Sequence, residues 1–291
     1  MWALLAVLSA FFLGFYDICK KRSLNNNSVI GVLTCSIVIS AIVLSPLLLT
    51  NGFPTADGVA HVRILIKSIL VLTSWLCGYI ALKHLPISIV SPMQASRPMW
   101  TLLGALLIFH ESLNLWQWAG VICTLGSVFA FSFSIKRGKQ DARGQGRFYI
   151  FLVLAILTGA MCGLYDKHVM RMYDHRLVQV WYTIYQAGMM LIVCAVDYVI
   201  QKRKEHPIAT FHWSWAIVGI SVFLILSDYT YLLALRNPDS LIAVVSTIRR
   251  AGTVIPFLYG IIILKEKQIG TKVACLCGIL LGLLCLLMGS L

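Results

Sequence analysis

The sequence predicts an all-α membrane protein with ten transmembrane helices, arranged as two inverted five-helix repeats. Three observations predict this fold class. Of the 291 residues, 59% are hydrophobic and 12% are charged, and the mean hydropathy of +0.85 is far above that of soluble domains. Apolar runs of spanning length follow one another with short polar breaks. Several motifs of the first half also recur in the second half in the same order.

The apolar runs are each long enough to cross a bilayer as a helix. The breaks between them carry residues that stop helices, such as Pro54, Pro86 and the pair Asn237-Pro238. The first run lacks a basic leader and a small-residue cleavage site, so we expect a retained span and not a signal peptide. The expected spans are Trp2–Cys19, Val29–Leu49, Val62–Leu82, Ile87–Phe109, Leu115–Ile135, Phe148–Lys167, Val178–Ile200, Trp213–Leu235, Leu241–Leu264 and Gly270–Met288.

The internal repeat divides the chain into residues 1–135 and 148–291, joined by a basic connecting loop at 136–147. Because each half has an odd number of helices, the second must enter the membrane from the opposite face. Many carriers build a substrate site at the midplane of such an inverted repeat. The matching motifs are Gly14-Phe15-Tyr16-Asp17 with Gly163-Leu164-Tyr165-Asp166, Ala81-Leu82-Lys83 with Ala234-Leu235-Arg236, Arg97 with Arg250, and His110-Glu111 with Lys265-Glu266.

On these motifs the whole chain resembles the drug/metabolite transporter superfamily, specifically its EamA-type ten-helix members. The Gly-x-Tyr-Asp motifs stand where relatives often have Trp-Gly-x-Asn. The resemblance implies a carrier with alternating access and a central cavity, lined mainly by the first, third, fourth, sixth, eighth and ninth helices. It also implies termini on the cytoplasmic side, whereas the Lys/Arg bias of the loops places both termini outside. Arginines in the middle of helices are a departure from the family pattern.

Those arginines are the main candidates for contact with a substrate. Arg249 and Arg250 lie in the middle of one expected span, and Arg97 lies at the same depth in the first half. Lipid offers no partner to a cation at this depth, so each should face a wet cavity or an acidic residue. A guanidinium group binds a carboxylate or phosphate with two hydrogen bonds. We therefore expect Arg97 and Arg250 to bind an anionic group of the solute, with structural ion pairs to Asp as the alternative, and Arg249 to have a structural partner.

Polar and aromatic side chains near these arginines complete the expected site. Asp228 is the most deeply placed carboxylate, and it is either a proton carrier or a permanent counter-ion to Arg249 or Arg250. The aromatic residues either contact the solute or serve packing. Pro92, Pro98 and Pro256 should bend the helices beside the arginines. The expected substrate-binding residues are Arg97, Arg250, Gln94, Asp228, Tyr231, Ser246, Trp75 and Tyr79.

Each repeat also places an Asp shortly before a Lys near the end of its first helix. These are Asp17 with Lys20 and Asp166 with Lys167. They are either local ion pairs at a helix end or a gate that exchanges partners during rocking. With Arg249 they form the expected set of gating or ion-pair residues.

The sequence offers no nucleotide-binding loop, metal constellation or nucleophile elbow, so we expect no catalytic residue, metal or cofactor. The net charge of +13 is scattered over short loops, which fits anionic lipid headgroups and not nucleic acid. We expect a multi-pass secondary transporter of the inner membrane, monomeric or homodimeric, for a small organic anion or carboxylate-bearing zwitterion, with protons as a candidate coupling ion. The alternatives are a flippase or exporter of a lipid-linked or nucleotide-activated anion, and a membrane enzyme acting on lipid phosphates.

Overall fold

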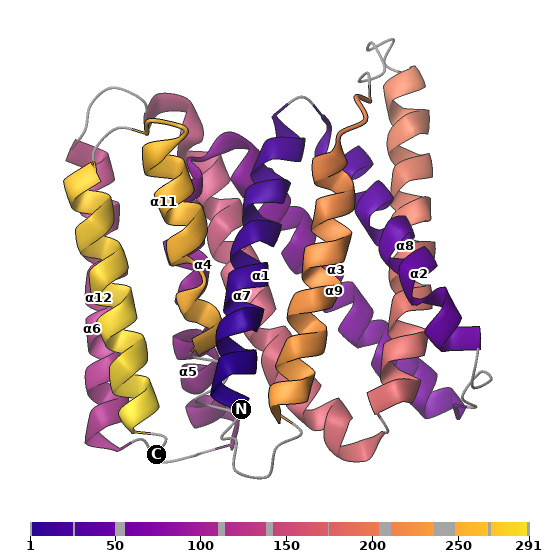
Figure 1. Cartoon of the computed structure of the whole chain (residues 1–291), viewed down its shortest axis with the longest axis horizontal. Helices are drawn as coiled ribbons and strands as arrows, with labels where there is room; N and C mark the ends of the chain where they lie inside the picture. The colour runs from indigo at the N-terminus through magenta and orange to yellow at the C-terminus, as the bar shows by residue number, and fades with distance from the viewer. Residues whose placement is uncertain are drawn as a thin grey trace.

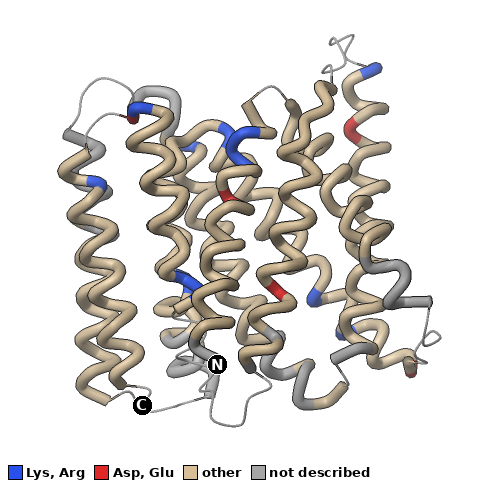
Figure 2. The backbone as a smooth tube through the Cα atoms, viewed as in Figure 1, with Lys and Arg blue, Asp and Glu red and all other residues tan. Residues whose placement is uncertain are grey.

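The computed structural model describes residues 2–25, 27–49, 56–109, 114–137, 142–173, 175–203, 211–235, 248–266 and 269–289, and the regular secondary structure within them is entirely helical. The helices run up and down between two ends of the molecule, and the N- and C-termini lie at the same end (Figure 1). Most charged positions lie toward the helix ends, and a few lie midway along the helices (Figure 2).

The boundaries follow the apolar runs closely, because each run ends at a polar or proline-containing break. One difference is at the expected connecting loop, where residues 142–147 belong to a helix that begins before the bilayer-length run. The helices are α1 (Trp2–Leu24), α2 (Val29–Leu49), α3 (Gly58–His84), α4 (Ile87–Ala95), α5 (Arg97–Phe109), α6 (Leu115–Arg137), α7 (Ala142–Met172), α8 (His175–Arg203), α9 (Trp215–Leu235), α11 (Val254–Ile262) and α12 (Ile269–Met288).

Four of the described helical segments are long and apolar enough to span a membrane: Gly58–His84, Gly146–Tyr165, Leu177–Lys202 and Ile269–Met288. Two shorter apolar segments come from α2 and α9. The count of ten spans stays a prediction, because residues 236–247, which include the start of the ninth expected span, lie outside the described residues.

Two expected spans are interrupted where their arginines lie. The span Ile87–Phe109 is divided by a turn at Ser96, so that α5 begins at Arg97. In the second half, a turn at Gly252 and Thr253 precedes α11. The prolines that follow explain both breaks, because Pro98 and Pro256 have no N–H group for the carbonyl four residues earlier. Ser96 strengthens the first break, since its hydroxyl donates to the Met93 carbonyl at 2.6 Å.

Long-range packing joins the two halves of the chain. Helix α1 packs along α9 and α3 packs along α7, while α2 contacts α8, α4 contacts α11, and α6 packs along α12. Figure 1 shows the α6–α12 pair at one side of the molecule and α8 at the other. The main buried cluster takes residues from both halves, including Leu82 and Met99 from the first and Ile220 and Ile279 from the second. The two halves therefore share one core.

Gly252 lets α1 approach the second break closely. A Cβ atom at Gly252 would overlap the backbone carbonyl of Ala10, and a backbone atom cannot rotate away as a side chain can. We therefore expect Gly252→Ala to lower the free energy of unfolding by about 1–3 kcal/mol, measured by denaturant unfolding in detergent. The control is Gly270→Ala, because an added Cβ at Gly270 meets nothing within 4 Å. Equal effects of the two substitutions would contradict this account of Gly252.

Candidate functional site

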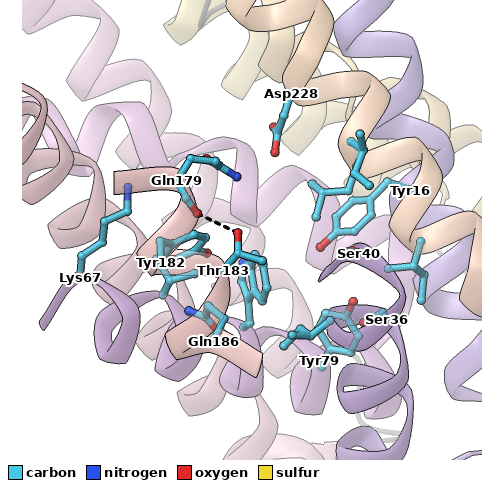
Figure 3. A pocket seen from close by; sticks show the side chains of 16 residues that line it. Tyr16, Ser36, Ser40, Lys67, Tyr79, Gln179, Tyr182, Thr183, Gln186 and Asp228 are labelled. Carbon is cyan, nitrogen blue, oxygen red and sulfur yellow. Dashed lines mark hydrogen bonds between the residues drawn. The ribbon is translucent and has the colours of Figure 1, made fainter. Parts of the chain in front are cut away.

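A cavity of about 230 Å³ lies between α1, α2, α3, α8 and α9 (Figure 3). Its wall combines hydroxyl, amide and aromatic groups with one lysine and one carboxylate. Of the residues expected at the substrate site, Trp75, Tyr79 and Asp228 line it. The polar side chains that line it are Tyr16, Ser36, Ser40, Lys67, Tyr79, Gln179, Tyr182, Thr183, Gln186 and Asp228.

Asp228 faces the cavity and is ion-paired with Arg249. Arg249 also donates to the Ser227 hydroxyl at 3.2 Å, and its guanidinium carbon lies 4.6 Å from the centre of the Tyr231 ring. Arg249 therefore has a structural partner, and the pair supports the counter-ion interpretation of Asp228. Tyr231 stacks on this arginine and is not among the residues that line the cavity. The Asp228 side chain is 52% exposed, so the carboxylate remains open to the cavity.

The Asp17–Lys20 pair lies beside the part of the cavity wall that Tyr16 and Tyr79 form. Lys20 Nζ is 2.8 Å from Asp17 Oδ1, and the two side chains are 8% and 17% exposed. The same ammonium group lies 4.3 Å from the Tyr16 ring centre and 5.2 Å from that of Tyr79, and both rings line the cavity. This is the local pairing at a helix end, with two aromatic rings adding cation–π contacts.

Arg97 lies where α5 begins and points toward α3 and α7. Its Nη2 atom lies 3.4 Å from the Ser74 hydroxyl oxygen, which itself donates to the Ala155 carbonyl at 2.8 Å. The guanidinium packs on Gly159, where a Cβ atom would be 2.8 Å from the guanidinium carbon. The Nε atom is buried without a hydrogen-bond partner among the described residues. Arg97 is therefore held by packing and by one long hydrogen bond.

The Arg250 side chain is half-buried and lies near Arg97. It interacts electrostatically with Arg97, Arg249 and Asp17. No described residue forms an ion pair with its guanidinium group, because the ion pairs of the described part involve Lys20, Arg249 and Lys272. Neither Arg250 nor Arg97 lines the cavity between α1, α2, α3, α8 and α9. The arginines thus form a neighbouring cluster, joined to the cavity through the Asp228–Arg249 pair.

Among the remaining expected residues, the structure describes the side chain of one and leaves the side chains of the other three outside the described part. Gln94 of α4 lies against α3, with its amide nitrogen 3.5 Å from the position of a Cβ atom at Gly78. Ser246 lies outside the described residues. The backbone at Asp166 and Lys167 is part of α7, but the side chains of both residues lie outside the described part of the structure.

Sequence reasoning missed one whole wall of the cavity. Lys67 of α3 is 8% exposed and lies 5.1 Å from the Tyr182 ring centre. Gln179, Thr183 and Gln186 add polar groups from α8. A signal was present, because these three residues recur at steps of four and three along an apolar helix and so share one face. Lys67 likewise stands inside the expected span Val62–Leu82.

The wall also differs from the one implied by the resemblance. The cavity is lined by helices that correspond to the first, second, third, seventh and eighth expected spans, and not mainly to the first, third, fourth, sixth, eighth and ninth. Close packing accounts for part of this difference, because α7 meets α3 directly through the hydrogen bond between Ser74 and the Ala155 carbonyl.

The end of the molecule away from the termini is tied together by polar contacts. Lys21 of α1 donates to the Leu82 and Leu85 carbonyls at 2.7 and 2.8 Å. Asn27 exchanges two hydrogen bonds with the backbone of His212, at 2.9 and 2.7 Å. These bonds join α1 to the end of α3, and the segment before α2 to the segment before α9.

Glu266 forms a second set of polar contacts between the two halves. Its carboxylate accepts the Ile87 backbone N–H at 3.1 Å and the Ser88 hydroxyl at the start of α4. It also pairs with Lys272 of α12 at 3.1 Å. A carboxylate at this position caps the helix and is favoured by its dipole. Elsewhere in the described part, no group of three or more His, Cys, Asp or Glu side chains is placed to hold a metal.

With this geometry in place, comparison with known proteins identifies the family of the first half. Residues 1–133 match the EamA-like transporter family. A solved crystal structure of a protein with 12% sequence identity has the same fold, with a TM-score of 0.62 over 98% of this chain and 97% of the other. No curated protein matches the sequence.

The EamA-like match confirms the resemblance to the drug/metabolite transporter superfamily that the motifs indicated. Together with the apolar helices, the match over residues 1–133 indicates a multi-pass membrane protein and suggests a membrane transporter. The cavity and the arginine cluster are therefore the places in the described part of the chain at which binding of a small molecule is best tested.

Proposed function

We propose that the protein is a secondary transporter that carries a small organic anion, or a zwitterion with a carboxylate, across the inner membrane by alternating access. The observation that carries this proposal is the unbalanced positive charge at the two helix breaks. Asp17 is paired with Lys20 and Asp228 is paired with Arg249. Arg97 and Arg250 therefore have no carboxylate of their own among the described residues.

An unpaired guanidinium group inside a membrane protein is costly. A solute that brings a carboxylate or phosphate would supply the missing partner, because a guanidinium binds such groups with charge-assisted hydrogen bonds. The cost is then offset each time the anion binds. The buried Nε atom of Arg97 is a donor that such an anion could satisfy.

The packing supports an inverted repeat of two five-helix units, residues 1–135 and 148–291. If the halves are related by a two-fold axis, α1 must pair with α9 as α3 pairs with α7, and α2–α8, α4–α11 and α6–α12 must each join equivalent helices. Those are the observed contacts. Each half also has a helix break beside its repeated arginine, at Ser96 before Arg97 and at Gly252 after Arg250. Interrupted helices beside a midplane site are typical of such carriers.

The conformation is consistent with one state of an alternating-access cycle. The contacts of Lys21, Asn27 and Glu266 close the end away from the termini. Opening that end would require these hydrogen bonds to break while the halves rock against each other. The cavity volume of about 230 Å³ favours a metabolite over the larger lipid-linked or nucleotide-activated anion of the alternative.

A metabolite screen with the purified protein tests the proposed function. Anionic and zwitterionic metabolites should raise the melting temperature in detergent, because ligands that bind the folded state stabilise it. Cationic metabolites of the same size should have no effect, since the arginine cluster repels them. Each stabilising compound should then exchange across the membrane in proteoliposomes. Stabilisation and exchange by cations alone would contradict the proposal.

A further inference from the structure

Two hydroxyl groups on the cavity wall donate their protons to carbonyl groups of their own helices. Thr183 donates to the Gln179 carbonyl at 2.8 Å, which Figure 3 draws as a dashed line. Ser36 donates to the Leu33 carbonyl at 2.9 Å. A hydroxyl that donates to its own helix in this way offers lone pairs to the cavity. Both residues therefore present acceptors to a ligand.

Gln186 presents a third acceptor, and a hydrogen bond to Ser68 determines the orientation of its side-chain amide group. Its Nε2 atom donates to the Ser68 carbonyl at 2.9 Å. Since a carbonyl can only accept, the amide nitrogen must face Ser68 and the amide oxygen must face the other way. The residue is 2% exposed, and Oε1 is buried with no hydrogen-bond partner among the described residues. A buried acceptor without a donor is costly, so this atom marks the place of a missing donor.

Asp228 adds a charged acceptor to this side of the wall, and Lys67 is the one cationic side chain among the lining residues. Asp228 projects from α9 toward the space that Thr183 and Gln186 line from α8 (Figure 3). Trp75 and Tyr182 add ring surface to the wall. Carboxylate, amide and hydroxyl oxygens beside aromatic rings fit an ammonium or a hydroxyl group of a ligand.

We propose that this acceptor wall binds a hydrogen-bond donor group of the substrate, an ammonium or a hydroxyl, and that Gln186 Oε1 is the atom that selects for it. The inference rests on the proposed function, in which the substrate is a small anion or a zwitterion with a carboxylate. The substrate class is then a small anion that carries an amino or hydroxyl group, and a plain carboxylate of equal size is discriminated against.

Three acids of nearly equal size test this inference with the purified full-length protein: propionate, lactate and alanine. Apparent dissociation constants come from the rise in melting temperature at graded concentrations. Lactate or alanine should bind at least about tenfold more tightly than propionate, because the analogue without a donor leaves the buried acceptors unpaired. The stronger of the two identifies the donor as a hydroxyl or an ammonium.

Variants of the acceptor wall show which residues cause the preference for lactate or alanine over propionate. Gln186→Met should reduce it to about twofold or less, and Thr183→Val, which leaves the Ser68 contact intact, should reduce it partly. The control is Gln201→Met, because Gln201 lies at the far end of α8 and bonds to Asp197 of the same helix at 2.6 Å.

The outcomes separate this inference from the proposed function. Equal binding of the three acids by the wild type, or a preference that survives in both Gln186→Met and Thr183→Val, would overturn the acceptor wall and leave the anion carrier standing. Binding of none of the three acids, together with no stabilisation by any anionic or zwitterionic compound of the metabolite screen, would overturn both. Should Gln186→Met not fold, Thr183→Val decides the question, because it leaves the Gln186–Ser68 hydrogen bond in place.

Discussion

Arg250→Ala is expected to reduce transport at least about a hundredfold while leaving the protein at least as stable as the wild type. The loss of transport follows from removing a charged group that pairs with the anion, an interaction whose loss costs several kcal/mol when it is desolvated. Stability should not fall, because no described residue forms an ion pair with Arg250. Alanine removes a half-buried charge that lies near two other guanidinium groups.

Two arginine and lysine variants serve as controls. Arg249→Ala removes the neighbouring guanidinium but leaves Asp228 without its partner, so it should lower the melting temperature, which Arg250→Ala should not. Lys202→Ala removes an exposed cation near the end of α8 and should leave transport unchanged. Counterflow in proteoliposomes and thermal unfolding measure the two effects. Wild-type transport by Arg250→Ala would remove this residue from the anion site.

Asp17→Ala is expected to destabilise the protein strongly, by about 3–5 kcal/mol, because it leaves the Lys20 ammonium buried and unpaired. The pair is 2.8 Å apart, and the Lys20 side chain is 8% exposed. The Tyr16 and Tyr79 rings near this ammonium offset part of the loss but do not replace a carboxylate. Denaturant unfolding in detergent measures the change.

The double variant Asp17→Ala/Lys20→Met distinguishes a structural pair from a gate. If the pair is structural, removing both charges should restore most of the stability and leave transport near normal, because no buried charge remains unpaired. If the pair exchanges partners during rocking, stability should return but transport should not. A small effect of Asp17→Ala alone would contradict the buried ion pair that the structure describes.

Much of the helical architecture could be predicted from the sequence, because bilayer-length apolar runs and prolines are local signals. The breaks beside Arg97 and Arg250 follow from Pro98 and Pro256, which the sequence displays directly. The structural partner of Arg249 and the pairing of Asp17 with Lys20 were also expected. The family match over residues 1–133 confirms the class that these motifs indicated.

The cavity wall was harder to predict, because it depends on which helices pack together. Whether Gln186 faces lipid, a neighbouring helix or a cavity is decided by Ser68, a residue 118 positions away. Periodicity places Gln179, Thr183 and Gln186 on one face of α8, but it does not say what that face meets. Lys67 was missed for the same reason, since its aromatic partner Tyr182 belongs to the other half of the chain.

The central claim is that Arg97 and Arg250, whose guanidinium groups form no ion pair with any described residue, bind the negative group of the substrate. A cryo-EM structure with the transported anion bound tests this most directly. The account predicts that the carboxylate or phosphate oxygens lie about 3 Å from the guanidinium nitrogens of Arg97 or Arg250. An anion bound elsewhere in the protein, with neither guanidinium in contact with it, would contradict the account.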